Sequence, residues 1–165
     1  MKKKILFIRH AKSSWDNVLL ADYDRPLNER GHQNAPIMAK KIANEILSNA
    51  FIITSPALRA LQTAEYFIRA WQIQQENVIQ LSNLYEGDPE DYLNAFTSMS
   101  ESVDTLVFFG HNPALDEICN SIKFCPVVHV PTCGVIISEI ENIQWTEITF
   151  AEIRYVEHVF PKMLI

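Results

Sequence analysis

The sequence has few of the residues on which nucleotide-binding loops and metal sites depend. It contains four glycines and neither GxGxxG nor GxxxxGK followed by Ser or Thr, so the common loops that hold nucleotide phosphates are excluded. It also has no CxxxxxR loop, no HxxxH or HExxH motif and no pair of aspartates spaced for magnesium, and His32 and His129 lie far from the strand ends described below. We therefore expect neither a bound metal nor a cofactor.

Cysteine, positive charge and long apolar runs are also scarce. The three cysteines are odd in number and form no CxxC pair, which favours reduced structural thiols over disulfides. The formal net charge of −6 provides no basic field for nucleic acid or an anionic membrane, although it allows a local cationic pocket. No run approaches the roughly 20 apolar residues of a membrane span, and the apolar part of MKKKILFI is shorter than the roughly 7 to 15 residues of an export signal. We expect a cytoplasmic protein without nucleic-acid or membrane partners.

Short apolar runs alternate with stretches of helical periodicity. Strands are predicted at 5–8, 50–54 and 77–81 and in the run DTLVFFG before His111, and helices at 35–47, at 55–71, after Asp88 and after Pro113. From Cys133 onward, two segments alternate better and predict edge or antiparallel strands. The chain is thus predicted to be one α/β domain over residues 1–165, a three-layer α/β/α sandwich whose mostly parallel sheet has an antiparallel edge.

The local pattern gives more detailed expectations for two of the helices. In the second, Ser55 is predicted as the N-cap and Pro56 as the first helical residue. Its expected buried stripe is Leu58, Leu61, Ala64, Ile68 and Trp71. The segment DYDRPLNERG before the first helix is predicted to be a loop, and Pro36 is expected to start or kink that helix.

Arginine and histidine side chains lie at the ends of three predicted strands. Arg9 and His10 follow the first strand, Arg59 lies in the helical turn after the second, and His111 follows the fourth. Alone, each has an ordinary structural explanation, an ion pair or a hydrogen-bonded cap. Open α/β sheets bind ligands at this edge, and a cation in the first turn of a helix is unfavourable unless an anion lies nearby. With the amino ends of two helices, these side chains predict a site for a dianionic phosphoryl group.

Histidine is the nucleophile that remains once the absent motifs are set aside. A neutral imidazole can attack phosphorus and carry the phosphoryl group as a covalent intermediate, which divides one difficult displacement into two easier ones. The residues therefore predict phosphoryl transfer through a histidine.

The segments RHAKSSW, SPALRALQTAE and GHNP resemble, in this order, motifs of the histidine phosphatase superfamily, whose fold is shared with phosphoglycerate mutases. The short chain and the form RHAKS…DRPLNERG resemble the SixA-like phosphohistidine phosphatase branch. The resemblance covers nearly the whole chain. It implies that His10 is the nucleophile, that Arg9 and Arg59 bind the phosphoryl oxygens, that His111 donates to them, and that no metal is needed.

The chain departs from the family pattern directly after the nucleophile. Ala11 replaces a glycine, and Asp16 stands where many members have an asparagine that contacts phosphate. Asp16 is expected to face outward, because a carboxylate repels phosphate. Whether Asn17 takes the role of the asparagine that contacts phosphate in other members stays open. Lys12 and Ser13 are predicted to contact the substrate, although Ser13 also fits a helix cap.

A general acid is the least defined part of the predicted site. Many family members have a glutamate after the third strand that protonates the leaving group, and Glu86 is the nearest match. Asp88 is better explained as an N-cap.

Two classes of function fit these residues. The first is a metal-independent phosphatase with its intermediate on His10, and the second is a phospho-ligand binding module without turnover; the presence of the nucleophile favours the enzyme. The segments 10–28, 72–88 and 121–133 are short compared with the insertions of the mutase relatives, which predicts an open pocket that admits a side chain of another protein. We expect phosphohistidine on a signalling protein as the substrate, with small phosphate esters as the alternative.

Overall fold

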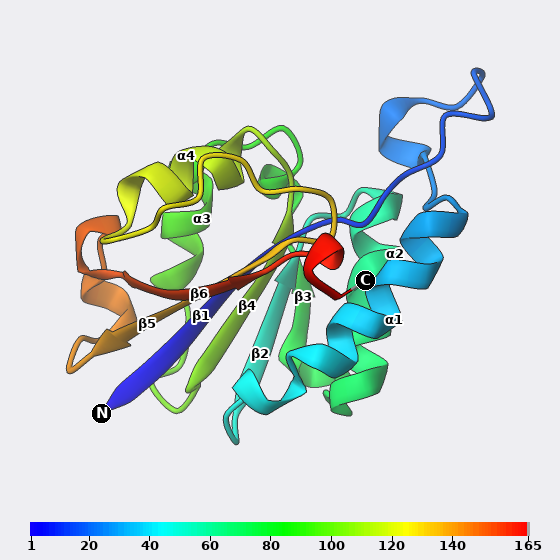
Figure 1. Cartoon of the computed structure of the whole chain (residues 1–165). Helices are drawn as coiled ribbons and strands as arrows, with labels where there is room; N and C mark the ends of the chain where they lie inside the picture. Colours follow the sequence, from blue (N-terminus) through cyan, green and yellow to red (C-terminus); the bar gives the residue numbers. More distant parts are fainter. Residues whose placement is uncertain (165) are drawn as a thin grey trace.

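The computed structural model describes residues 1–164 and contains a mixed six-stranded sheet, in the order β3-β2-β4-β1-β5-β6 (Figure 1). The strands are β1 (Lys2–Arg9), β2 (Ala50–Thr54), β3 (Val78–Gln80), β4 (Thr105–Gly110), β5 (Val135–Glu141) and β6 (Arg154–Val159). The neighbours β3, β2, β4 and β1 pair in parallel, whereas β5 is antiparallel to both β1 and β6. The predicted α/β fold with a mostly parallel sheet and an antiparallel edge is confirmed.

Helices cover both faces of the sheet. They are α1 (Glu29–Lys41), α2 (Leu58–Trp71), α3 (Pro89–Phe96) and α4 (Ala114–Ser121). The 3-10 helices are η1 (Asp22–Asp24), η2 (Ala43–Glu45), η3 (Gln75–Asn77), η4 (Ser82–Leu84), η5 (Trp145–Glu147), η6 (Phe150–Glu152) and η7 (Pro161–Leu164). α1 and α2 pack on one face and α3 and α4 on the other (Figure 1). Within residues 1–164, no helix is long and apolar enough to span a membrane.

Alternate residues of β1 belong to two different cores. Leu6 and Ile8 pack in the same core as Phe67 of α2, whereas Ile5 and Phe7 pack in the core that contains α3 and α4. All four strand residues are at most 1% exposed. Burial on both faces explains why this strand is an unbroken apolar run rather than an alternating one.

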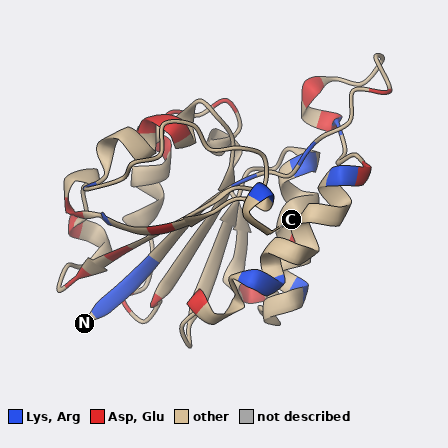
Figure 2. Ribbon diagram, viewed as in Figure 1, with Lys and Arg blue, Asp and Glu red and all other residues tan. Residues whose placement is uncertain are grey.

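The lysines at the start of β1 lie at the opposite end of the strand from Arg9 (Figure 2). Lys2 forms an ion pair with Glu139 at 3.1 Å, and the buried Lys3 pairs with Glu101. The positive start of the sequence therefore holds β1 against its neighbours.

Helix α2 begins later than the sequence predicted. Its first residue is Leu58, with Ala57 rather than Ser55 at the cap position. The hydroxyl of Ser55 does accept the N–H of Ala57 at 3.2 Å, but it also lies 2.7 Å from a ring nitrogen of His111. The buried positions of the helix are Arg59, Ala60, Thr63, Ala64 and Phe67. Of the predicted stripe only Ala64 is buried. The face of the helix that packs on the sheet is formed instead by small residues and Phe67.

Helix α1 lies earlier in the chain than predicted. It starts inside the expected loop, where the side chain of Asn28 accepts the N–H of Gly31 at 2.9 Å, and it contains Pro36 in its interior. The first turn is polar and gave no apolar periodicity, so the sequence revealed only the later turns.

Candidate active site

The parallel register brings the predicted strand-end residues together. Arg9 of β1 is opposite Gly110 of β4, so His10 and His111 are the first residues beyond two neighbouring strands. The N–H of His10 donates to the carbonyl of Gly110 at 3.1 Å, and the two imidazole rings lie 5.2 Å apart between centroids. Arg59, in the first turn of α2, lines a hollow together with Arg9, His10 and His111.

His10 is held as one neutral tautomer. Its Nδ1 lies 2.7 Å from the carbonyl oxygen of Ala11, which can only accept, so Nδ1 carries the proton and Nε2 keeps its lone pair. Burial lowers the pKa of His10 to about 3, and the neighbouring His111, Arg59 and Arg9 lower it further, against the opposing effect of the bond to Ala11. The ring is therefore an uncharged imidazole at neutral pH.

His111 is fixed through its ring and its backbone. Nε2 lies 2.7 Å from Ser55 Oγ, and its backbone N–H donates to the hydroxyl of the buried Tyr92 at 3.3 Å. Ser55 Oγ accepts from Ala57 and still has a hydrogen to donate; when it donates to Nε2, the imidazole proton of His111 is on Nδ1. Burial, followed by the charge of Arg59, lowers the pKa of His111 to about 4.

The two arginines present donors that the protein does not use. Arg9 donates from Nη1 to the carbonyl of Val130 at 3.0 Å, and burial lowers its pKa. At this edge of the described chain, Arg9 Nε, Arg59 Nε and His111 Nδ1 are buried without a hydrogen-bond partner, as is one acceptor, Asn112 Oδ1. Unpaired buried donors are costly, and their gathering at one strand edge indicates a place for an anion.

Asp22 is a member of this cluster that the sequence did not identify. Arg59 donates to its carbonyl oxygen at 2.7 Å and to its carboxylate at 3.0 Å, and Tyr85 and Arg25 also donate to the carboxylate, at 2.8 and 3.1 Å. Burial alone would raise the pKa of Asp22, but these donors outweigh it and lower the pKa to about 2. The carboxylate of Asp22 thus forms an ion pair with Arg59. The sequence did not indicate this role, because Asp22 lies in a segment that was predicted to be a loop.

The residues after His10 border the same hollow. Lys12 and Ser13 line it together with Arg9 and His10. Ser13 does not cap a helix, because no helix of the described chain begins between it and η1, and its hydroxyl accepts from Arg25 at 2.8 Å.

Asp16 and Asn17 lie in the exposed part of the chain that follows. Asp16 is exposed, and the side-chain oxygen of Asn17 accepts the N–H of Leu19 at 3.0 Å. Asn17 therefore shapes a turn.

Glu86 borders an adjoining hollow. This second hollow is also lined by Asp22 and Tyr85, and it shares Arg59, His111 and Asn112 with the hollow around His10. The exposed Glu86 has a positive φ of 58°, which turns the chain sharply between η4 and α3. The structure therefore brings Glu86 to the rim near His111, beyond the cluster around His10.

His129, which was expected to lie far from the strand ends, is not among the residues that line the hollow around His10, although its neighbour contacts Arg9. It immediately precedes Val130, whose carbonyl binds Arg9, and its ring contacts Asp116 at 2.9 Å. The loop that follows α4 returns to the border of the site, where Val130 binds Arg9 and Thr132 lines the hollow, which its sequence position did not reveal. In the described residues 1–164, no three His, Cys, Asp or Glu side chains are grouped so that they could hold a metal ion.

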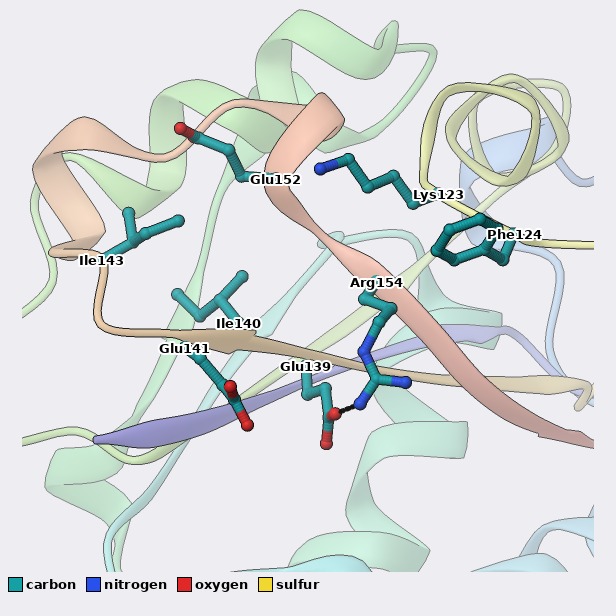
Figure 3. A pocket seen from close by; sticks show the side chains of 8 residues that line it. All are labelled: Lys123, Phe124, Glu139, Ile140, Glu141, Ile143, Glu152 and Arg154. Carbon is teal, nitrogen blue, oxygen red and sulfur yellow. Dashed lines mark ion pairs between the residues drawn. The ribbon is translucent and has the colours of Figure 1, made fainter.

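A separate hollow lies toward the other end of β5 (Figure 3). Glu139 of β5 and Arg154 of β6 form an ion pair there. This ion pair links the two strands.

Three comparisons place this geometry among known proteins. The family model described as histidine phosphatase superfamily (branch 1) matches residues 5–116. The fold is similar to a structure described as a candidate phosphohistidine phosphatase SixA from Agrobacterium tumefaciens, with a TM-score of 0.80 and 23% identity over 96% of this chain and 98% of that one. It is also similar to a structure of the protein histidine phosphatase SixA complexed with tungstate, with a TM-score of 0.77 and 20% identity over 98% and 99% of the two chains.

A relative from a plant is similar in sequence. An uncharacterized chloroplastic protein of Arabidopsis thaliana is 24% identical over 159 residues, covering 89% of this chain and 71% of the relative.

Proposed function

Because the chain belongs to the histidine phosphatase superfamily, we propose that it is a phosphatase in which His10 carries the phosphoryl group between substrate and water. The orientation of His10 is the observation that carries this proposal: Nδ1 binds the Ala11 carbonyl, so Nε2 keeps a lone pair beside Arg9 and Arg59. A buried neutral imidazole next to two guanidinium groups is suited to attack an anionic phosphoryl group.

In the first step, Nε2 of His10 attacks phosphorus. The P–N bond forms, and the bond to the leaving group breaks with its electron pair on the leaving group. Arg9 and Arg59 bind the phosphoryl oxygens through the donors that the protein leaves unpaired. His111 donates from Nδ1 as negative charge develops.

In the second step, a water molecule attacks phosphorus. The P–N bond breaks, its electron pair returns to Nε2 of His10, and inorganic phosphate leaves. The same cationic groups serve both steps, because the charge on the phosphoryl oxygens is similar in the two transition states. No metal ion takes part in either step of this proposal.

The leaving group needs a proton in the first step. We propose Glu86 as its source, and its carboxylate then as the acceptor of a proton from the attacking water in the second step, because Glu86 borders the hollow that Arg59 and His111 share. For phosphohistidine this demand is small, since the leaving ring nitrogen is readily protonated.

Phosphohistidine on a signalling protein is the substrate that we propose. Little of the chain covers the site: between β1 and α1, and between β3 and α3, the described residues form only the short helices η1 and η4. The similarity to SixA structures supports this substrate class, and one of these structures holds tungstate, a tetrahedral oxyanion. Lys12 and Ser13 are proposed as further substrate contacts.

Small phosphate esters are the second candidate substrates. The position of Glu86 favours them, because an alkoxide leaving group depends strongly on a general acid.

A substrate panel tests these proposals. It compares kcat/KM for a phosphohistidine protein, free phosphohistidine, phosphoramidate, phosphoserine, phosphotyrosine and a sugar phosphate. We expect phosphohistidine on the protein to be hydrolysed best, and His10→Ala to lose activity by several orders of magnitude. The matched control is His32→Ala on α1, whose ring contacts Tyr66 at 2.8 Å, away from the site. A higher kcat/KM for the sugar phosphate or phosphoserine would replace the first candidate by the second.

A further inference from the structure

The segment 14–25 projects from the body of the protein at the edge of the candidate site (Figure 1). Large apolar side chains are concentrated on it: Trp15 is 68% exposed, Val18 88%, Leu19 91%, Leu20 37% and Tyr23 40%. Single exposed apolar residues are common on protein surfaces, but such a cluster in one short segment marks an interaction surface.

The projecting segment is held in a defined shape. Arg25 stacks on the ring of Trp15 at 3.5 Å and donates to Ser13 and to the carbonyl of Ser14. At its tip, Asn17 accepts the N–H of Leu19 and closes a turn. Because the segment is already ordered, it loses less conformational entropy when a partner binds than a flexible loop would.

The segment is also continuous with the candidate site. Trp15 lines the hollow around His10, and Asp22 binds Arg59 directly. By contrast, Val18 and Leu19 are not among the residues that line this hollow. A small phosphate ester bound at His10 therefore leaves them uncovered, whereas a protein that presents its phosphoryl group to His10 is large enough to contact them.

We propose that segment 14–25 is the docking surface for the phosphorylated protein substrate, and that it binds an apolar patch with basic residues around it, beside the phosphohistidine. This inference rests on the proposed function. The exposed Asp16 and Asp24 favour a partner with basic residues at the rim of the contact. The net charge of −6 and these acidic groups oppose a second copy of the chain as the occupant.

Two phosphohistidine peptides test the docking surface. One has leucine residues around the phosphohistidine and the other has serine residues, both carry the same lysine residues, and both are prepared with phosphoramidate. We expect the wild-type protein to prefer the first peptide by about tenfold or more in kcat/KM, the effect expected from burying a few apolar side chains. In Val18→Ser/Leu19→Ser the preference is lost through a higher KM, while the rate on free phosphohistidine stays unchanged. Phe124→Ser, which removes an 80% exposed ring beside the hollow of Figure 3, should keep the preference.

Each other outcome has a distinct meaning. Equal rates for the two peptides in the wild type, or a preference that survives in the double variant, would overturn the docking surface and leave the proposed function standing. No hydrolysis of either peptide or of free phosphohistidine would instead reject the proposed function. A dimer in sedimentation that dissociates in the double variant would assign the segment to self-association and also overturn the docking surface.

Discussion

Arg59 links the candidate site to the loop that borders it. Its two terminal nitrogens donate to the carbonyl and the carboxylate of Asp22, while its Nε is buried without a partner in the described chain. A lysine has one nitrogen and cannot hold Asp22 at two points while binding a phosphoryl oxygen. We expect Arg59→Lys to lower kcat/KM by about 100-fold or more.

The matched control for this change is on the same helix. Arg69 of α2 is largely exposed and pairs only with Glu65 in the described structure, so Arg69→Lys should keep wild-type kcat/KM. Equal rates for both lysine variants would show that the two-pronged contact of Arg59 is unimportant.

The buried histidines predict a dependence of stability on pH. Burial lowers the pKa of His10 to about 3 and that of His111 to about 4, below the value of about 6.5 in an unfolded chain. Between these values and pH 6.5 the unfolded chain binds more protons, so the free energy of unfolding falls as the pH falls. In urea titrations at pH about 7 and about 5, wild type should lose more stability than His10→Gln/His111→Gln. The same loss in both proteins would contradict the neutral state of the pair.

Sequence reasoning found the residues that follow the strands, but not their partners. Arg9, His10 and His111 could be predicted because a strand end is visible as the end of an apolar run. Asp22 and Ser55 could not, because their roles depend on contacts with Arg59 and His111, which are distant in the sequence.

At the scale of elements, the start of α1 is fitted to the chain after His10. A Cβ at Gly31 would lie 2.3 Å from the carbonyl oxygen of Lys12, which also accepts the N–H of Asn28. We expect Gly31→Ala to destabilise the protein by about 1 to 3 kcal/mol, although alanine is the better helix former, because this backbone must move. Equilibrium unfolding measures the effect, and kcat/KM should fall with it, since Lys12 and Ser13 border the site.

The exposed Gln33 of the same helix provides the comparison. Gln33→Ala should leave stability within about 0.5 kcal/mol of wild type. If Gly31→Ala were as stable as this variant, the close packing of α1 against Lys12 would be refuted.

The elements themselves were predicted unevenly. The buried strands were found because two-sided burial demands apolar runs, as in residues 5–8. The start of α2 was misplaced because Ser55 fits the pattern of a helix cap, whereas its hydroxyl also contacts His111. The projection of segment 14–25 had no signature, because exposed apolar side chains look the same in a sequence as buried ones.

At the scale of the whole molecule, an acidic protein gathers cationic side chains at one edge of its sheet. Arg9 and Arg59 meet there, although the chain carries a formal net charge of −6. With His111 they compensate the charge of a phosphoryl group, so we expect EDTA to leave kcat/KM unchanged. Activity that is abolished by the chelator and restored by magnesium or zinc would contradict this account. That residues 1–165 form one domain stays a prediction, as does a cytoplasmic location.

The central claim is that His10 carries the phosphoryl group, and trapping the intermediate tests it most directly. The wild-type protein is mixed with ³²P-labelled substrate, quenched during turnover, digested and mapped. The account predicts label on His10 that is labile in acid and stable in alkali, as a phosphoramidate is, and no such label in His10→Ala. Label on Ser13 or Ser14, or turnover without any labelled protein, would contradict it.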